Sequence, residues 1–324
     1  MNNTEKVAVC SRSFSSNTYL REKLCSSYLH VKFNDDGVVL QGDNLVQYLS
    51  GHQKAIVGLE SISADVLSRL PDLQVVSKFG VGLDGLDLTA MQNAGIKIGW
   101  ESGVNCRSVS ELVLAVAILL VRKANEANSD VRRGVWQQKV GNLLSGKVVG
   151  IVGCGAIGKD LVSLLQPFGC EILAYDIRDY SEFYKKHRVN EVSLNDLLQE
   201  SDLVTIHLPL DQSTENMFSR EILSQLKRGV VLLNAARGGI VDEHALKDLL
   251  LSGHIAAAGF DVFRVEPPED LELLGLPNFY ATPHIGGSAE EAVLAMGEAA
   301  IRGLDQCVEP RAIYRTSARC DIKK

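Results

Sequence analysis

Short apolar runs alternate with amphipathic segments along most of the chain. Apolar runs of about 4–8 residues that are bounded by polar or glycine-containing segments are typical of strands buried in a parallel sheet. The expected strands are residues 6–10, 54–58, 73–79, 96–100, 148–153, 171–176, 203–208, 230–236, 256–263 and 279–282. Because helical patterns lie between these runs, the sequence predicts an α/β fold with parallel sheets that are covered by helices on both faces.

Two longer apolar segments mark a change of domain. The first follows Ser108 and predicts a helix over residues 109–124. Ser108 stands three residues before Glu111, as in a capping box, so we expect Ser108 to cap this helix. The second predicts a helix over 288–308 that returns to the first domain. The six expected strands between the two helices suffice for one doubly wound unit. The expected organisation is a domain of residues 105–287 inserted into a domain formed by residues 1–104 and 288–324.

The composition is that of a soluble globular protein. The 324 residues are 46% hydrophobic and 23% charged, and their net charge of −7 comes without long runs of one sign, which argues against a nucleic-acid or anionic-membrane partner. The longest apolar stretch, 112–121, is too short to cross a bilayer, and the N-terminus lacks the pattern of a signal peptide. The seven cysteines form no C-x-x-C pair, so we expect buried, reduced thiols and a cytoplasmic location rather than disulfides or a metal site.

The segment "GIVGCGAIGKD" contains Gly153, Gly155 and Gly158 in the spacing G-x-G-x-x-G. The spacing alone is a weak signal, but here it follows an expected strand and opens an expected helix, which is the context of a dinucleotide-binding turn. Backbone N–H groups and the helix dipole at such a turn favour a pyrophosphate. Asp176, at the end of the next strand, can accept hydrogen bonds from the adenosine ribose, which favours NAD over NADP, although Arg178 close by weakens that preference.

Three further expected strands, consecutive along the chain, end in ionisable residues: Arg237, then Asp261 and Glu266, then His284. Each has an ordinary explanation when seen alone, as a surface arginine, a loop carboxylate or a turn histidine. Ligands of open α/β sheets bind at the carboxyl ends of the strands, however. The three strand ends together therefore predict a reaction site beside the dinucleotide.

These side chains suit hydride transfer to a 2-keto acid. The guanidinium of Arg237 can bind the substrate carboxylate and polarise the adjacent carbonyl. His284 can donate a proton to the carbonyl oxygen, and Glu266 can fix the tautomer of the imidazole and favour its charged form.

A glycine-rich turn in the first domain can bind the same substrate. The segment "SKFGVGLDGLDL" places Gly80, Val81 and Gly82 just after an expected strand, and its backbone amides can hold a carboxylate. Lys78 can add positive charge or point to solvent. A plain turn explains these glycines almost equally well.

The order and spacing of these motifs resemble those of the D-isomer-specific 2-hydroxyacid dehydrogenases. The resemblance extends from about residue 54 to about residue 303, and it is carried by "KFGVGLDGLDL", "SVSELVLA", "GKVVGIVGCGAIG", "HLPL", "NAARGGIVDE", "GFDVFRVEP" and "TPHIGGS". It implies a Rossmann cofactor domain inserted into a flavodoxin-like substrate domain, both with doubly wound parallel sheets. It also implies NAD as the cofactor, no metal ion, and a homodimer formed through the arm around the long helix.

The resemblance also implies roles for single residues. The catalytic residues are expected to be Arg237, Glu266 and His284. The positions expected to line the cofactor are Gly153, Gly155, Ala156, Ile157, Gly158, Asp176, His207, Pro209, Thr214, Ala235, Ala236, Asp261 and Gly286. The positions expected to bind substrate are Lys78, Gly80, Val81, Gly82 and Arg237. His207 also has a plain explanation as the end of a strand.

The substrate stays open at the level of sequence. The chain is most similar to the phosphoglycerate dehydrogenase branch, but Glu60 stands in a loop where phosphate-binding members often carry arginine, and no regulatory domain is expected before the chain ends at residue 324. Hydroxypyruvate, glyoxylate and other 2-keto acids fit equally well. The alternative from another class is an NAD(H)-sensing binding protein of the same fold, since such proteins keep the same three polar residues. Formate dehydrogenase chemistry is disfavoured, because that branch has glutamine where this chain has Glu266.

Overall fold

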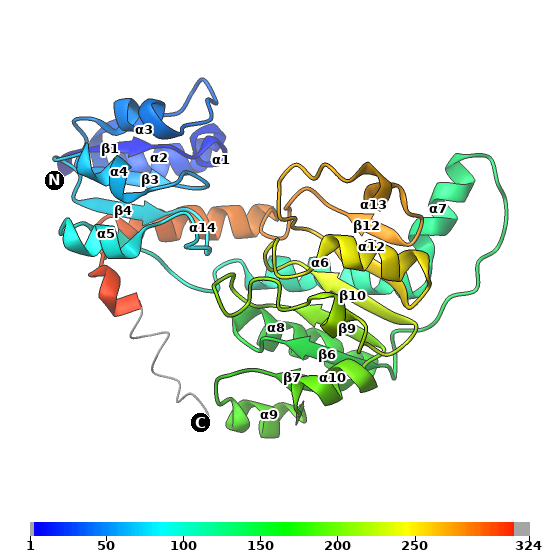
Figure 1. Ribbon diagram of the computed structural model, residues 1–324. Helices are drawn as coiled ribbons and strands as arrows, with labels where there is room; N and C mark the ends of the chain where they lie inside the picture. Colours follow the sequence, from blue (N-terminus) through cyan, green and yellow to red (C-terminus); the bar gives the residue numbers. More distant parts are fainter. Residues whose placement is uncertain (1–2, 314–324) are drawn as a thin grey trace. The chain divides into compact units, whose positions relative to one another are not determined.

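In the computed structural model, which describes residues 3–313, the chain divides into two compact units. The first unit combines the chain up to Asn105 with the described residues from Glu290 onward, and the second unit is Cys106–Ala289 (Figure 1). The sequence predicted these two domain boundaries one and two residues earlier, at 104–105 and 287–288. Each unit has its own parallel sheet and its own apolar core.

The sheet of the first unit has five parallel strands in the order β2-β1-β3-β4-β5. The strands are β1 (Asn3–Val9), β2 (Tyr28–Phe33), β3 (Lys54–Val57), β4 (Val75–Lys78) and β5 (Lys97–Gly99). This is the flavodoxin-like order, so the expected fold of this unit is confirmed. The sequence did not predict β2, because this edge strand leaves most of its side chains partly or fully exposed and therefore lacks a continuous apolar run.

Helices lie on both faces of this sheet. They are α1 (Arg12–Ser16), α2 (Thr18–Ser27), α3 (Gly42–Leu49), α4 (Ala64–Ser68), α5 (Leu88–Asn93) and α14 (Glu290–Gly303). The side chains of Asn17, Ser63 and Asp87 accept backbone N–H groups in the first turns of α2, α4 and α5, as N-cap residues do. The sequence predicted that the last helix continues to residue 308, but Val308 instead exchanges two backbone hydrogen bonds with Ile98 of β5.

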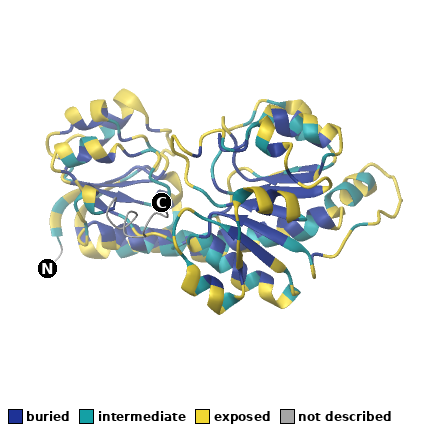
Figure 2. Ribbon diagram, turned by 60° about the horizontal axis from the view of Figure 1, so that its bottom comes forward, coloured by how far each residue is buried: buried dark blue, intermediate teal, exposed yellow. Residues whose placement is uncertain are grey.

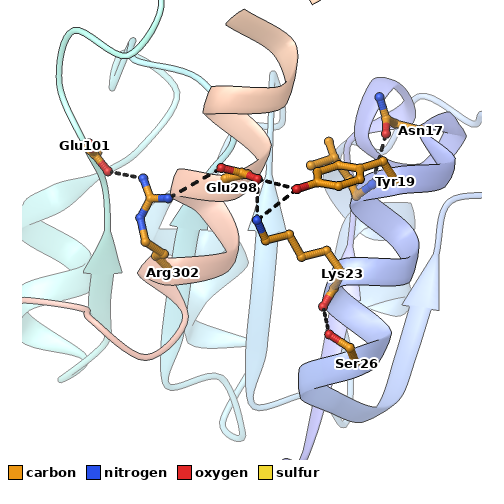
Figure 3. Close-up of polar contacts among 8 residues, drawn as sticks. Asn17, Tyr19, Lys23, Ser26, Glu101, Glu298 and Arg302 are labelled. Carbon is orange, nitrogen blue, oxygen red and sulfur yellow. Dashed lines mark hydrogen bonds and ion pairs between the residues drawn. The ribbon is translucent and has the colours of Figure 1, made fainter. Parts of the chain in front are cut away.

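A polar cluster fixes the returning helix α14 within the first unit (Figure 3). Glu298 accepts a hydrogen bond of 2.7 Å from the hydroxyl of Tyr19 and forms an ion pair with Lys23, both on α2. Arg302, one turn later, donates to Glu101 at 2.8 Å. Exposed pairs of this kind each contribute only about 0–1 kcal/mol. The apolar face that α14 buries against α2 and the sheet contributes more, and both contacts place the end of the described chain in the first unit.

The sheet of the second unit has seven parallel strands in the order β12-β11-β10-β9-β6-β7-β8. The strands are β6 (Val148–Val152), β7 (Glu171–Tyr175), β8 (Asn190–Glu191), β9 (Leu203–Ile206), β10 (Val230–Asn234), β11 (Ile255–Phe260) and β12 (Phe279–Ala281). All six expected strands are confirmed, and only the two-residue β8, which is exposed, was not expected. The order is that of a Rossmann sheet with one added strand, and it reverses between β6 and β9, where such sheets bind dinucleotides.

The helices of the second unit include one whose start differs from the prediction. They are α6 (Cys106–Val121), α7 (Ala124–Arg132), α8 (Ala156–Leu165), α9 (Ser181–His187), α10 (Leu194–Glu200), α11 (Arg220–Leu223), α12 (Glu243–Leu251) and α13 (Leu271–Gly275). The prediction that Ser108 caps the long helix is wrong. α6 begins at Cys106, two residues before Ser108, and the hydroxyl of Ser108 donates to the carbonyl of Gly286. α6 ends at Val121, since Lys123 adopts a left-handed conformation with φ of 53°.

The inner strands of both sheets are buried, whereas the edge strands β2 and β8 and the outer faces of the helices are exposed (Figure 2). Neighbouring residues of one strand, such as Ile151 and Val152, belong to different apolar clusters, as expected for a sheet that is covered on both faces. Within residues 3–313 no helix is both long and apolar enough to span a membrane.

The cysteines depart from the expectation that all are buried. Cys10 and Cys154 are buried, but Cys25 is exposed and the other described cysteines are only half-buried. Those in the described part of the chain are all free thiols. Cys320 lies outside the described residues.

Candidate active site

The glycine motif forms a tight turn between β6 and α8. Gly153 has φ of 91°, and a Cβ atom there would lie 2.6 Å from the carbonyl oxygen of His207. A Cβ on Gly158 would lie 2.6 Å from the carbonyl oxygen of Gly153, so both positions exclude any side chain. A Cβ on Gly155, by contrast, would meet no described atom within 4 Å. The space in front of the α8 N-terminus is therefore open to a phosphate, as a dinucleotide requires.

Asp176 is held in a fixed orientation beside this turn. It follows β7, and its Oδ2 accepts the backbone N–H of Cys154 at 2.7 Å, inside the glycine motif. Its Oδ1 accepts the N–H of Arg178 at 2.9 Å. Each carboxylate oxygen has a further lone pair, so Asp176 can still accept hydrogen bonds from ribose hydroxyls. A 2′-phosphate in the same place would meet its negative charge.

Four further positions expected to line the cofactor lie at the carboxyl ends of strands of the same sheet. Ala156 and Ile157 open α8, and Ala235 and Ala236 follow β10. Because all of these strands are parallel, the positions share the edge of the sheet at which the glycine turn lies.

The segment after β9 is organised around two polar side chains. The Nε2 atom of His207 lies 3.0 Å from the hydroxyl of Thr205, and burial lowers the pKa of His207 to about 4, so its ring is neutral near pH 7. Thr214 donates to the carbonyl of Pro209 at 2.7 Å and accepts the N–H of Asp211 at 2.8 Å. The two bonds of Thr214 close the loop between Pro209 and Thr214.

The strands that end before Arg237, Glu266 and His284 are direct neighbours. β10 pairs with β11, and β11 pairs with β12, all in parallel. The loops after β10 and β11 are also in close contact, because a Cβ on Gly238 would lie 1.9 Å from the carbonyl oxygen of Phe263. The structure thus brings the three residues to one edge of the sheet, as the sequence predicted.

Arg237 is positioned by the end of β10. The buried Asn234 donates to the carbonyl of Arg237 at 2.9 Å and accepts the N–H of Ala236 at 3.1 Å, which closes the turn. One guanidinium nitrogen, Nη1, donates to the carbonyl of Ala236 at 2.7 Å. The guanidinium has further N–H groups in a rigid fork that matches a carboxylate.

His284 contacts Glu266 directly. Its Nδ1 lies 2.9 Å from Oε2 of Glu266, and Oε1 of the same carboxylate accepts the N–H of Phe263 at 3.1 Å. Because Nδ1 is engaged, Nε2 is the ring nitrogen that can exchange a proton with a ligand. Both side chains are partly exposed, so a ligand can reach them.

The loop that carries His284 has a strained backbone. His284 has φ of 54°, a left-handed conformation that costs about 1–3 kcal/mol for residues other than glycine. Asp261 offsets this cost: its Oδ1 accepts the hydroxyl of Thr282 at 2.6 Å and the N–H of Ile285 at 2.7 Å, and its Oδ2 accepts the N–H of Gly286 at 2.7 Å. The sequence placed Asp261 among the ionisable residues at the strand ends and gave it the role of lining the cofactor, but it did not predict these contacts. The one sequence signal for them was a carboxylate directly after a buried strand.

In the first unit, Lys78 and the glycine-rich turn follow β4. Lys78 is buried and its ammonium donates to the carbonyl of Gly58, so it does not point to solvent. Gly80 has φ of 127°, and the indole N–H of Trp100 donates to the carbonyl of Val81 at 3.0 Å, which orients the turn. The turn therefore has a fixed shape, as an amide site for a carboxylate needs.

A pocket of about 300 Å³ adjoins this turn, at the carboxyl ends of β1 and β3. Its lining includes Arg12, Gln41, Leu59, Glu60 and Phe79, the last of which directly precedes the turn. The carboxylate of Glu60 accepts the N–H of Gly58 at 2.6 Å, so it is folded back onto its own loop at the pocket wall.

Known proteins are similar to this chain in sequence and in structure. A family model described as the NAD-binding domain of D-isomer specific 2-hydroxyacid dehydrogenases matches residues 114–286. The pyruvate reductase of Chlamydomonas reinhardtii has a similar structure, with a TM-score of 0.79 and 27% sequence identity over 93% of this chain and 95% of its own.

Two curated relatives match over different shares of their length. The hydroxypyruvate reductase of Thermotoga maritima is 35% identical over 264 residues, which is 80% of this chain and 85% of the relative. The D-3-phosphoglycerate dehydrogenase of Bacillus subtilis is 36% identical over 235 residues, 72% of this chain but 45% of the relative. The chain thus spans most of the first relative and about half of the second.

Proposed function

The chain belongs to the D-isomer specific 2-hydroxyacid dehydrogenases, and from this premise we propose that it interconverts a small 2-keto acid and its D-2-hydroxy acid with His284 as the acid–base residue. The family consists of NAD-dependent oxidoreductases. The observation that supports the role of His284 is the 2.9 Å contact between its Nδ1 and Glu266, in the unit that carries the dinucleotide turn. A histidine held in this way presents Nε2 for proton transfer.

Each of the three polar residues has a distinct role in this proposal. NADH, when bound, supplies the hydride. Arg237 binds the substrate carboxylate through paired N–H donors and so orients the neighbouring carbonyl. The protonated ring of His284 donates from Nε2 to the carbonyl oxygen, which becomes the hydroxyl, while Glu266 stabilises the charged ring. In the oxidation direction the neutral ring accepts the same proton. Acid–base help of this kind contributes about 10²–10⁴ in rate.

We infer from the first unit that the substrate is unphosphorylated. We infer that the amides of Gly80, Val81 and Gly82 bind the carboxylate end of the acid and that the adjoining pocket receives its other substituent. The pocket wall carries one cationic side chain, Arg12, and one anionic side chain, Glu60, so it has no net positive charge to hold a phosphate, and Gln41 can bind a hydroxyl group. Hydroxypyruvate and glyoxylate satisfy these conditions better than 3-phosphohydroxypyruvate does.

We also propose that the protein forms a homodimer through the arm, defined here as residues 124–143. The arm contains α7 and the loop after it, which extends away from the rest of the ribbon of the second unit (Figure 1). Trp136 and Val140 are 89% and 88% exposed, and Leu143 is exposed as well. Apolar side chains grouped on an extended segment are typical of a protein–protein contact.

The experiment that tests the proposed reaction is consumption of NADH with a panel of 2-keto acids, phosphorylated and unphosphorylated. The panel is run with the wild-type protein, with His284→Ala, and with His30→Ala as a control, because His30 is an exposed histidine on the edge strand β2. We expect turnover of hydroxypyruvate or glyoxylate that His284→Ala lowers by about 10²–10⁴-fold and His30→Ala leaves unchanged.

Two other outcomes would change the proposal. Turnover of 3-phosphohydroxypyruvate in preference to the smaller acids would contradict the role given to Glu60. Tight NADH binding without turnover of any acid would contradict the enzymatic proposal and would favour an NAD(H)-sensing protein.

A further inference from the structure

Ser108 of α6 is hydrogen-bonded to the segment that carries His284. Its hydroxyl donates to the carbonyl of Gly286 at 2.6 Å and accepts the N–H of Ala289 at 3.3 Å. A serine hydroxyl has one hydrogen to donate, so its only donor is used on this segment. We call residues 282–289, between β12 and α14, the histidine segment.

The stability of α6 does not account for Ser108. The helix begins at Cys106, so Ser108 lies inside its first turn and is not its cap. Ser110 shows the ordinary behaviour of a helical serine, since its hydroxyl donates to the carbonyl of Cys106, four residues earlier, at 2.9 Å, with a longer contact of 3.3 Å to the carbonyl of Ile157. The hydroxyl of Ser108 instead bonds to residues about 180 positions away in the sequence.

The histidine segment is held from two sides. Asp261, after β11, accepts the N–H groups of Ile285 and Gly286, and Ser108, on α6, binds the carbonyl of Gly286 and the N–H of Ala289. Gly286 is therefore fixed at both its N–H and its C=O. It lies two residues after His284, whose left-handed backbone conformation persists only where surrounding groups hold it.

We propose that Ser108 is a positioning residue for His284: through Gly286 it holds the histidine segment in the conformation in which the imidazole meets Glu266. The proposal rests on the proposed function of His284 as the acid–base residue. The same hydroxyl joins the two ends of the second unit, because α6 begins where the chain enters this unit and Ala289 is where the chain leaves it.

The test compares Ser108→Ala with Ser108→Thr, which keeps the hydroxyl. Ser201→Ala is the matched control, because Ser201 is fully buried before β9, at the opposite end of the strands, and its hydroxyl has no hydrogen-bond partner among the described residues. We expect Ser108→Ala to lower kcat by about 10–100-fold, with the Kd of NADH changed by less than about twofold. Ser108→Thr should restore most of kcat, and Ser201→Ala should retain it.

A second measurement does not depend on turnover. In spectra of the protein with ¹³C-labelled histidine, the imidazole resonance of His284 is assigned by its loss in His284→Ala. We expect this resonance to shift or broaden in Ser108→Ala and to return in Ser108→Thr. If the wild-type protein reduces no acid but the resonance still responds in this way, the proposed reaction fails and the positioning role stands. A resonance that is unchanged in Ser108→Ala overturns the positioning role whatever the activity, and so does a loss of kcat that Ser108→Thr fails to restore.

Discussion

Nδ1 of His284 and Oε2 of Glu266 lie 2.9 Å apart although the two residues follow different strands and stand 18 positions apart in the sequence. The second carboxylate oxygen of Glu266 accepts the N–H of Phe263, so the carboxylate cannot rotate freely. The imidazole of His284 is therefore oriented by a carboxylate that is itself oriented by a backbone N–H group. A general acid–base residue needs such supporting contacts, because proton transfer depends on the position of its ring.

Replacing the carboxylate should impair proton transfer and not cofactor binding. In Glu266→Gln a neutral amide can no longer stabilise the charged ring or enforce its tautomer, so we expect kcat to fall by about 10²–10⁴-fold while the Kd of NADH is unchanged. Glu266→Asp keeps the charge and should retain part of the activity. Glu269→Gln, three residues along the same loop and exposed, is the control. Steady-state kinetics with kcat of Glu266→Gln close to that of the wild type would remove Glu266 from the mechanism.

Asp176 should determine the choice between NADH and NADPH. Its carboxylate is held by the N–H groups of Cys154 and Arg178, so it cannot turn away from a 2′-phosphate. In Asp176→Ala we expect the Kd of NADH to rise and the preference for NADH over NADPH to fall by about tenfold or more, which corresponds to about 1.4 kcal/mol. Asp179→Ala removes a nearby exposed carboxylate and the same charge, and it should leave the preference unchanged. Titration of protein fluorescence with NADH and with NADPH measures the two Kd values. An equal preference for NADH in Asp176→Ala and in the wild type would contradict the role of Asp176.

The strands of both sheets were largely predictable, because a strand buried on both faces needs a continuous apolar run such as "VVGIVG" or "LVTIHL". β2 was missed because an edge strand can expose its side chains. The direct contact between Glu266 and His284 was also predictable, since parallel order brings the ends of neighbouring strands together.

The support around His284 could not be predicted in the same way. Ser108 matched a local capping pattern, yet its partners are Gly286 and Ala289, and no local spacing relates residues so far apart. Asp261 similarly binds backbone N–H groups, which every residue type offers and which leave no trace in the sequence. Sequence patterns report burial and periodicity well, but hydrogen bonds from side chain to distant backbone depend on how the elements pack.

Disrupting the apolar surface of the arm should dissociate the proposed dimer. Trp136→Lys places a charge where we expect a buried aromatic contact, and loss of such a contact typically costs about 2 kcal/mol or more, roughly 30-fold in the Kd of the dimer. Leu251→Lys is the control, because Leu251 is an exposed apolar residue at the end of α12 in the same unit. Analytical ultracentrifugation over a range of concentrations measures the dissociation. A wild-type protein that sediments as a monomer, or a Trp136→Lys protein that stays dimeric, would contradict the dimer interface.

An ionic cluster around the buried Lys54 in the first unit should make stability depend on pH. The ammonium of Lys54 lies 2.8 Å from carboxylate oxygens of both Glu5 and Asp305 and 3.0 Å from the hydroxyl of Tyr28. The hydrogen bond from Lys54 lowers the pKa of Glu5. Burial alone would raise the pKa of Asp305, but hydrogen bonds from Lys54 and Tyr28 outweigh it and leave that pKa lowered. Burial likewise opposes the charge of Lys54, and the hydrogen bonds to Asp305, Glu5 and Tyr28 outweigh it, so its pKa is raised.

These shifts set the direction of the pH effect. Carboxyl groups whose pKa values are lowered in the folded state stabilise it above their usual pKa values, and that contribution is lost as the pH falls through the folded-state values. The contribution of Lys54, whose pKa is raised, persists at neutral pH and is lost only at strongly alkaline pH. We therefore expect Lys54→Met to lower the free energy of unfolding by about 1–3 kcal/mol at pH 7. We expect this difference to shrink as the pH falls from about 5 towards 3, because the unfolded chain takes up protons on these carboxyl groups before the folded wild type does. Urea unfolding of both proteins at several pH values measures the difference, with Lys6→Met, an exposed lysine on β1, as the control. A difference that stays constant or grows towards pH 3 would show that the cluster contributes through packing and not through charge.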